Sequence, residues 1–312
     1  MRTVIRVLIT VLIVILLAGM TVMIYNYRQE TQARSARIAE LSAQAKAYEA
    51  ELTQLKREQE TQEMQIYTPE GPGAAVVAFR VGGEETFAQA QAFGREYGFR
   101  PALLINTADE DLDYIIETVT DSGLEVILYS QGFSKNEAGR IRELHERLEE
   151  AGCENTDSYL LRASDDTEEN RAALSRAGIS TLFLYGDSLM SVIAEDGTAE
   201  LNYSYINKSS YNPANRLADL NGSEQALLFA IDMKETTVTD RQMDEIVGLI
   251  SEESDSGHIM IGTVENAVRT VRERMERENA NLEAFETEQE ERTARIAELE
   301  ETIRDIYSHW DD

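Results

Sequence analysis

The chain begins with an apolar segment that is long enough to cross a membrane. Val7–Tyr25 is a run of 19 residues without a charge, mostly Val, Ile and Leu. As a helix it would be roughly 28 Å long, close to the ~30 Å hydrocarbon core of a bilayer. Arg2 and Arg6 precede the run and acidic residues appear only after it, which favours a cytoplasmic N-terminus. We predict that residues 1–27 form a cytoplasmic start and one transmembrane anchor.

A cleaved signal peptide is the alternative interpretation of this segment. The apolar run exceeds the usual signal-peptide core, and Leu17–Met20 is a poor cleavage site because apolar residues continue through Tyr25. Both interpretations place the bulk of the chain outside the cytoplasm. Because these features favour the anchor, we predict a single-pass cell-membrane protein.

Two charged segments have heptad spacing. In residues 28–68, apolar or small residues recur at alternating intervals of three and four, at Ile38, Leu41, Ala45, Tyr48, Leu52 and Leu55. The last segment, residues 265–312, continues a heptad register that starts at Val264 and reaches Trp310. We predict one coiled-coil helix in each segment.

The two segments share an octapeptide, since Arg34–Leu41 matches Arg292–Leu299 in seven of eight positions. Shared coiled-coil composition explains this match as well as a common stalk does. If the helices fold back antiparallel with Ile66 beside Val268, the octapeptides lie at the same height and Trp310 returns to the membrane surface, where Trp is favourable. The alternative is self-association, in which each helix pairs with its twin in a homodimer.

Residues 69–264 alternate short apolar runs with amphipathic stretches. The predicted strands are Ala75–Val81, Ala102–Ile105, Leu124–Tyr129, Tyr159–Leu161, Thr181–Tyr185, Leu227–Ile231 and Ile259–Ile261. Continuous apolar strands that alternate with helices indicate an α/β fold with a parallel sheet buried on both faces, and seven of them suit a (β/α)7 barrel. Residues 186–224 interrupt the pattern with Gly, Asn, Ser and Tyr, so we predict an insertion there, with a hairpin from Ser191–Ile193 to Leu201–Tyr203.

Charge and composition narrow the function. The net charge is −29, of which residues 67–264 carry −22. This acidity argues against a nucleic-acid partner, because phosphate binding needs a basic surface. The single cysteine, Cys153, excludes an intrachain disulfide, and the three histidines leave little for a metal site.

The order of segments in residues 69–264 resembles that of polysaccharide deacetylases, whose NodB-homology domain is a distorted (β/α)7 barrel. That family opens on a strand ending Thr-Phe-Asp-Asp-Gly, and here Val77–Gly82 reads Val-Ala-Phe-Arg-Val-Gly. Its Arg-containing strand is similar to Leu160-Leu161-Arg162, and its closing motif is similar to Gly257–Glu265. The resemblance covers about 190 residues and rests on spacing and small-residue positions.

The chemistry of that family does not carry over residue by residue. Its catalytic Asp matches Arg80 and its metal-binding Asp matches Val81. Its two metal-binding histidines match Tyr129 and Phe133, and its late Leu-His motif matches Ala230-Ile231. A divalent metal needs about three protein ligands. We therefore expect no metal or other cofactor and interpret the domain as a degenerate, deacetylase-like pseudoenzyme.

The former active-site mouth is the predicted binding pocket, because function in such barrels sits at the carboxyl ends of the strands. Arg80, Tyr129, Phe133, Arg162 and Asp232 would point toward it. A simple ion pair between Arg80 and Asp232 is the structural alternative to a ligand-binding role.

Three functions follow from these patterns. The first is a membrane-anchored envelope module that binds a cell-wall glycan or an envelope protein. The second is an active hydrolase or deacetylase with an unconventional site. The third is a purely structural coiled-coil protein of the envelope.

Overall fold

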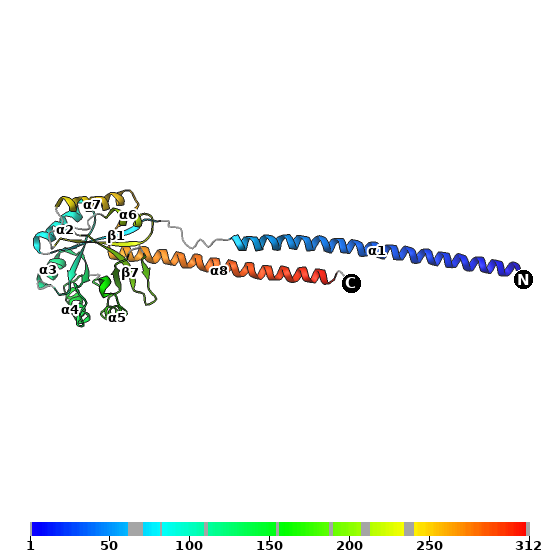
Figure 1. The fold of residues 1–312 in the computed structure, drawn as a ribbon, viewed down its shortest axis with the longest axis horizontal. Helices are drawn as coiled ribbons and strands as arrows, with labels where there is room; N and C mark the ends of the chain where they lie inside the picture. Colours follow the sequence, from blue (N-terminus) through cyan, green and yellow to red (C-terminus); the bar gives the residue numbers. More distant parts are fainter. Residues whose placement is uncertain are drawn as a thin grey trace. The chain divides into compact units, whose positions relative to one another are not determined.

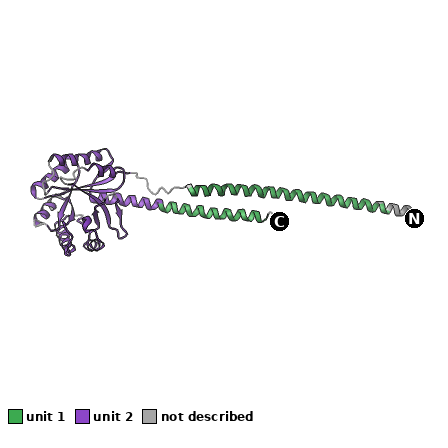
Figure 2. Cartoon of the chain, in the orientation of Figure 1, with its two compact units in different colours: residues 1–65, 282–312 green, residues 66–281 purple. Residues whose placement is uncertain are grey.

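The computed structural model describes residues 2–61, 71–81, 83–108, 112–153, 156–186, 190–206, 213–233 and 240–309. The chain divides into two compact units (Figure 2). One unit is Ile66–Asn281, and the other combines Met1–Gln65 with Leu282–Asp312. Each unit is described by itself below.

The unit Ile66–Asn281 is built on a closed barrel of parallel strands (Figure 1). Its seven strands are β1 (Gly73–Arg80), β2 (Ala102–Asn106), β3 (Glu125–Tyr129), β4 (Ser158–Leu161), β5 (Thr181–Leu184), β7 (Ala199–Ile206) and β8 (Ala226–Asp232). The barrel closes because β1 pairs with β8 on one side and β2 on the other. β2 pairs with the end of β1, and β9 (Ile259–Ile261) pairs with its beginning. The predicted (β/α)7 barrel is confirmed.

Helices cover the outside of the barrel (Figure 1). They are α2 (Glu84–Glu96), α3 (Leu112–Ser122), α4 (Glu137–Glu150), α5 (Glu168–Arg176), α6 (Ala214–Leu220) and α7 (Asp240–Asp255), with a single 3-10 turn at Ala163–Asp165. α2 and α5 are followed by glycines in the left-handed region, Gly98 at φ 72° and Gly178 at φ 92°. A residue without a Cβ is favoured in this conformation, which ends a helix and turns the chain back toward the sheet.

Strand alternation sorts the apolar side chains into two layers. Successive residues of a strand point to opposite faces, so every second side chain enters the barrel. In β1 the inward-facing residues are small, namely Ala74, Val76 and Ala78. The outward-facing residues, which pack under the helices, are Ala75, Val77 and Phe79. The same alternation turns the last residue of β1, Arg80, inward.

The start of α8 (Val264–Ser308) completes the inner layer. Val264, Ala267 and Val271 are buried in the same apolar cluster as the inward-facing strand residues. The main-chain N–H of Val264 donates to Oε2 of Glu125 at 2.9 Å. Since Glu125 is the first residue of β3, α8 begins at the amino-terminal end of the strands and packs against the barrel interior there.

The predicted insertion at residues 186–224 is wrong in one respect, because it contains a strand of the barrel itself. β6 (Val192–Ile193) and β7 do form the predicted antiparallel pair. β7 also pairs in parallel with β5 and with β8 and so closes the barrel. Among the described strands, the predicted strand at Ile259–Ile261 pairs with β1 alone. Asn202 and Ser204 are polar residues on the outward face of β7. They interrupt the apolar sequence of this strand, so it is not a continuous apolar run.

The second unit pairs α1 (Arg2–Thr61) with the later part of α8. Lys56 Nζ lies 2.6 Å from Glu300 Oε1, and the Tyr307 hydroxyl donates to Glu49 at 2.7 Å. Gln59 reaches Thr293 at 3.5 Å. In these pairs, a higher residue number in α1 goes with a lower residue number in α8. The two helices therefore run antiparallel within one chain.

The predicted register of this pair is wrong. Thr293 lies beside Gln59, whereas the sequence-based register put it beside Leu41, roughly 18 residues or 27 Å away along the helix. The shared octapeptides therefore do not face each other. The reason lies in α8, whose first turns are buried inside the barrel unit and are not available to α1. Trp310 lies outside the described residues.

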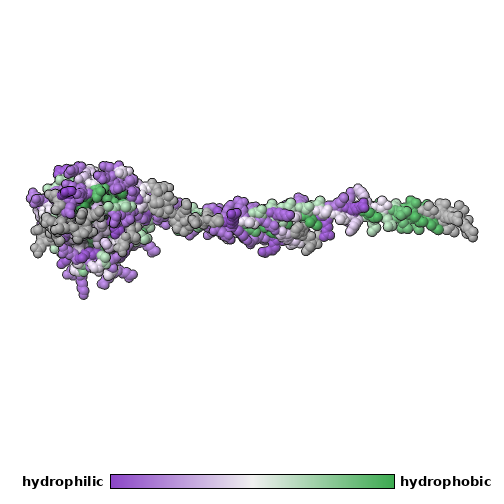
Figure 3. Space-filling model, turned by 45° about the horizontal axis from the view of Figure 1, so that its top comes forward, coloured by the Kyte–Doolittle hydropathy of each residue, from purple (hydrophilic) through white to green (hydrophobic). Residues whose placement is uncertain are grey.

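The N-terminal part of α1 is long and apolar enough to cross a membrane. Its described side chains from Val11 to Tyr25 are all exposed, and hydrophobic residues cover the face of this segment shown in Figure 3. Exposure of so many large apolar side chains in water is unfavourable, which supports association with a bilayer.

Glu125 makes the stability of the barrel depend on pH. Burial raises the pKa of this carboxyl above its usual range, although the N–H of Val264 favours the charged form. A raised pKa in the folded state stabilises the fold at low pH, and this contribution is lost as the pH rises through that pKa. Glu125→Gln keeps an acceptor for the N–H of Val264. We expect the free energy of unfolding of this variant, minus that of the unmodified chain, to be larger at pH 7 than at pH 4. Urea unfolding at both pH values measures this, and a difference that shrinks toward pH 7 contradicts it.

The antiparallel register is testable by crosslinking. In a Cys153→Ser background, we expect cysteines at Lys56 and Glu300 to be joined within one chain by a short thiol-reactive crosslinker. Cysteines at Ala39 and Ala297 are the matched control, because more than ten residues of helix, about 15 Å or more, separate them in this register. Gel electrophoresis distinguishes the products. A crosslinked dimer from the first pair, or an intrachain product from the control, contradicts the pairing.

Candidate functional site

A cavity of about 520 Å³ opens at the carboxyl ends of the barrel strands. We call it the tyrosine cavity and define it by its lining residues: Arg80, Tyr129, Ser130, Gln131, Leu160, Arg162, Tyr185, Tyr203 and Tyr205. They come from the ends of β1, β3, β4, β5 and β7 or from the residues that directly follow. In barrels of β/α units this is the end that carries binding and catalytic residues.

An ion pair between two neighbouring strands is buried beside this cavity. Arg80 ends β1 and Asp232 ends β8, and the two residues are direct neighbours in the parallel register. Nη1 of Arg80 donates to Oδ2 of Asp232 at 2.9 Å, and the two residues are only 7% and 2% exposed. The hydroxyl of Tyr205, from β7, donates to the same carboxylate oxygen. The pairing considered from the sequence is thus present in the fold.

The electrostatics of this cluster keep it charged. Burial by itself lowers the pKa of Arg80, but the facing Tyr129 and Asp232 outweigh burial and leave that pKa above its ordinary value. Burial and the hydrogen bond to Asp232 raise the pKa of Tyr205, which therefore stays a neutral donor. Arg80 accordingly stays a cation and Tyr205 a neutral phenol, and both donate to the Asp232 carboxylate.

Aromatic rings form much of the cavity wall. The guanidinium carbon of Arg80 lies 5.6 Å from the centre of the Tyr129 ring, in the range of a cation–π contact. Tyr185 and Tyr203 pack edge to face with their centres 5.9 Å apart. Burial raises the pKa of Tyr203, so its hydroxyl is also neutral. The cavity thus offers flat apolar faces edged with hydroxyl groups.

Arg162 supplies the other positive charge of the cavity. It directly follows β4, its side chain is exposed, and it donates from Nη1 to the main-chain oxygen of Gln131. Gln131 follows β3 in a turn where the hydroxyl of Ser130 donates to the main-chain oxygen of Gly132 at 2.8 Å. Arg162 therefore links the chain segments that follow two adjacent strands.

Four of the five residues predicted from the sequence gather here. Arg80, Tyr129 and Arg162 line the cavity, and Asp232 holds Arg80 from the neighbouring strand. Phe133 does not reach the cavity. It packs in the outer apolar layer, with its ring 6.4 Å from that of Tyr159. β3 ends at Tyr129, and the alternation of side-chain directions ends with it. The spacing within the strand therefore could not predict the direction of Phe133, four residues later.

Sequence reasoning missed Tyr185, Tyr203 and Tyr205, which line the cavity from β5 and β7. The signal was present, since Leu201, Tyr203 and Tyr205 alternate with polar residues at the period of a strand. Recognising this segment as a barrel strand, rather than as part of an insertion, would have placed the two tyrosines at its inner face.

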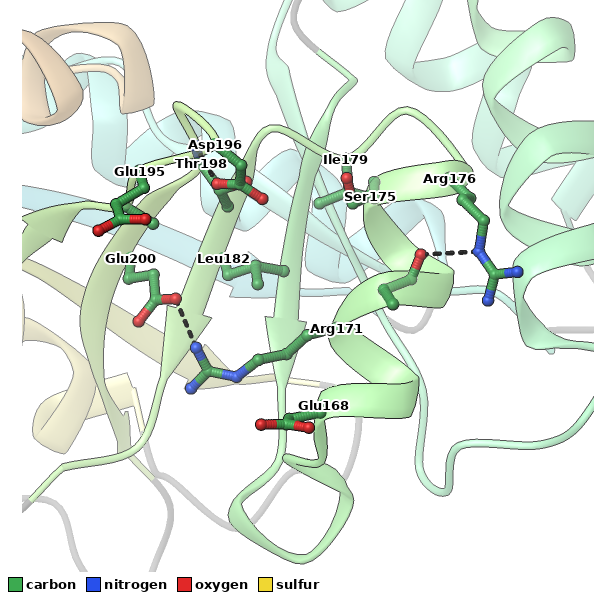
Figure 4. Close-up of a pocket in the computed structure, with 12 residues that line it drawn as sticks. Glu168, Arg171, Ser175, Arg176, Ile179, Leu182, Glu195, Asp196, Thr198 and Glu200 are labelled. Atoms are coloured by element: carbon green, nitrogen blue, oxygen red, sulfur yellow. Dashed lines mark hydrogen bonds and ion pairs between the residues drawn. The ribbon is translucent and has the colours of Figure 1, made fainter.

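A second cavity, of about 580 Å³, lies between α5 and the β6–β7 hairpin (Figure 4). Arg171 reaches from α5 toward Glu200 on β7 and also donates to Asp166 at 2.5 Å. Arg176 bonds to the main-chain oxygen of Ala172 in its own helix, at 3.0 Å. Because two carboxylates already hold Arg171, this cavity is the weaker candidate for an anionic ligand.

The residues at the positions of the family's metal site do not fit a divalent metal. Where that family has its catalytic carboxylate, this chain has the buried cation Arg80, which would repel a metal ion at that place. Within the part of the chain that the structure describes, no three His, Cys, Asp or Glu side chains are grouped so that they could hold a metal. The groups that the described lining offers to a ligand are hydrogen-bonding groups, the arginine charges and aromatic faces.

Comparison with protein-family models gives no match, and comparison with curated proteins gives none either. Solved structures are similar in fold. A Mycobacterium smegmatis protein classed as a polysaccharide deacetylase is 12% identical, with 68% of this chain and 94% of that chain covered and a TM-score of 0.44. The peptidoglycan deacetylase PdaC from Bacillus subtilis is 15% identical, with 70% and 99% covered and a TM-score of 0.43.

The similar structures also include another class of barrel enzyme. A truncated 3-deoxy-D-arabino-heptulosonate 7-phosphate synthase from Thermotoga maritima is 12% identical, with 62% of this chain and 91% of that chain covered and a TM-score of 0.37. These likenesses concern the barrel fold alone.

The buried pair is testable by a double-mutant cycle. We expect Arg80→Met to lower the free energy of unfolding by about 3–5 kcal/mol, because it leaves the Asp232 charge buried without its cation. Asp232→Asn should lower the free energy of unfolding by a similar amount, since it leaves the charge of Arg80 buried without its anion. The double variant should cost less than the sum by about 2 kcal/mol, because no uncompensated charge remains and the new amide oxygen at position 232 still accepts from Tyr205. Chemical denaturation of the four proteins measures the cycle, and strictly additive effects contradict the pairing.

Proposed function

We propose that this chain is a membrane-anchored, extracytoplasmic protein of the cell envelope whose deacetylase-like barrel binds a saccharide without hydrolysing it. A coiled-coil stalk formed by α1 and α8 presents the barrel. The observation that carries the proposal is the tyrosine cavity, a concave site at the carboxyl ends of the strands with aromatic walls and hydrogen-bonding rims.

The lining of the cavity favours a saccharide over a protein as the ligand. Sugar rings present C–H faces that pack on aromatic rings and hydroxyls that pair with polar edges, and Tyr185 and Tyr203 supply both. A volume of about 520 Å³ suits a ligand of a few rings and is small for a folded partner. An envelope protein remains the alternative occupant, and a saccharide-binding assay separates the two.

The chemistry at the floor of the cavity supports a non-catalytic role. Hydrolysis of an N-acetyl group by a metal-assisted mechanism needs a bound metal to activate water and a carboxylate to accept its proton. Arg80 stands where the resemblance places the base, and Val81 stands where it places a ligand. Asp232 cannot serve as a free base, because its carboxylate already accepts from Arg80 and Tyr205.

The apolar start of α1 supports the membrane anchor, and the resemblance to polysaccharide deacetylases supports an envelope location. Anchoring would confine the barrel to the vicinity of the membrane. A purely structural role for the helices makes a different prediction, since it requires no ligand in the tyrosine cavity.

Saccharide binding is testable with the 312-residue chain in detergent micelles. We expect chitotetraose to bind in isothermal titration calorimetry, and Tyr185→Ala or Tyr203→Ala to weaken binding roughly tenfold or more, about 1.4 kcal/mol, through loss of the aromatic wall. Tyr114→Ala is the matched control, because Tyr114 is an exposed tyrosine of α3 outside this cavity.

Two parallel measurements test the non-catalytic part of the proposal. Elemental analysis of the purified protein should find no stoichiometric metal, and incubation with chitotetraose should release no acetate. Stoichiometric metal together with acetate release would establish an active deacetylase. Absence of saccharide binding would favour a protein ligand or a structural role.

A further inference from the structure

The lining of the tyrosine cavity has a different charge balance from the domain around it. Residues 67–264 carry a net charge of −22, yet the described residues that line the cavity include two arginines and no aspartate or glutamate. At physiological ionic strength, charges are screened over about 8 Å, so a ligand inside the cavity senses mainly its lining. Because Asp232 offsets Arg80, the positive charge that remains in the lining is that of Arg162.

The charge of Arg80 is already balanced. Its guanidinium is bound to Asp232 at 2.9 Å and lies under the ring of Tyr129. Asp232 in turn accepts from Tyr205. Breaking a buried pair of this kind is costly, so Arg80 is a fixed part of the floor rather than a group that a ligand can recruit.

Arg162 is placed differently. Its side chain is exposed at the mouth, and its described hydrogen bond is from Nη1 to the main-chain oxygen of Gln131, a neutral acceptor. Among the described residues it forms no ion pair with a carboxylate, and the nearby Asp165 does not line the cavity. A guanidinium has five N–H donors in a planar fork that matches a carboxylate or phosphate, so most of this fork is open to a ligand.

The tyrosines fix where an anion would sit relative to a sugar ring. Tyr203 packs against Tyr185 and lines the same cavity as Arg162, and the charges of both Arg162 and Asp165 act on its hydroxyl. Since Arg162, Tyr185 and Tyr203 line one cavity, a ligand that packs on the aromatic pair can also contact Arg162. Neutral phenol groups beside the arginine can donate to the same anion.

We infer that the tyrosine cavity selects saccharides that carry an anionic group, a carboxylate or a phosphate, and that Arg162 binds that group. This inference rests on the saccharide binding proposed above and adds the class of saccharide. Arg162 is the discriminating residue, whereas the aromatic wall binds neutral and acidic sugars alike.

A matched pair of oligosaccharides tests the inference with the 312-residue chain in detergent micelles. Chitotetraose is neutral, and hyaluronan tetrasaccharide alternates N-acetylglucosamine with glucuronate. We expect hyaluronan tetrasaccharide to bind roughly tenfold more tightly, and Arg162→Gln to remove that advantage while leaving chitotetraose binding in place. Arg176→Gln is the control for loss of one positive charge, because Arg176 lies on α5 outside this cavity and bonds within its own helix. The preference for the acidic sugar should also fall as the salt concentration rises.

The source of the anion is distinguished by two further ligands. N-acetylglucosamine 6-phosphate, compared with N-acetylglucosamine, shows whether a phosphate on the sugar is also preferred, which would support the inference. Inorganic phosphate that competes as well as the acidic sugars would reveal a free-anion site and overturn it. Equal affinity for the two tetrasaccharides also overturns it while leaving saccharide binding intact. Failure of every saccharide to bind overturns both proposals.

Discussion

Two buried charges at the ends of adjacent strands constrain the barrel mouth. Arg80 and Asp232 close β1 and β8 in the same register, and strand alternation turns both side chains toward the interior. Neither charge is tolerable there alone, so each depends on the other and the hydroxyl of Tyr205 completes the cluster. This cluster lies beside the tyrosine cavity and fixes the position of Arg80 in its lining.

The opposite end of the barrel is closed by the helix that continues into the second unit. Val264, Ala267 and Val271 of α8 share the inner apolar cluster with the strands, and Glu125 accepts the first free N–H of that helix. Arg274, one turn further on, donates to the main-chain oxygen of Ser191 and so binds α8 to the β6–β7 hairpin. α8 is therefore part of the barrel core before it pairs with α1, and this determines which residues of α8 remain for the pairing.

Much of this fold could be predicted from the sequence because it depends on local patterns. Continuous apolar runs gave the positions of β1, β3 and β8, and the glycines after the helices marked where they end. The inward direction of Arg80 and Asp232 follows from the period of two in apolar strands. β7 was not predicted as a barrel strand, because Asn202 and Ser204 on its outward face interrupt the apolar pattern. Its place in the barrel is set by pairing with β5 and β8, which the local pattern does not show. Phe133 and the register between α1 and α8 were wrong for a related reason, since a loop direction and a helix offset are set by packing rather than by spacing.

We propose that the buried charge cluster and the aromatic rings form a saccharide-binding site that holds no catalytic metal. A crystal structure of the chain grown with chitotetraose and zinc ions tests it most directly. The account predicts a sugar ring against Tyr185 and Tyr203, with Arg80 still bound to Asp232 and no zinc ion at the strand ends. A zinc ion coordinated at this mouth with the saccharide's acetyl group beside it, or a saccharide bound only elsewhere on the protein, would contradict it.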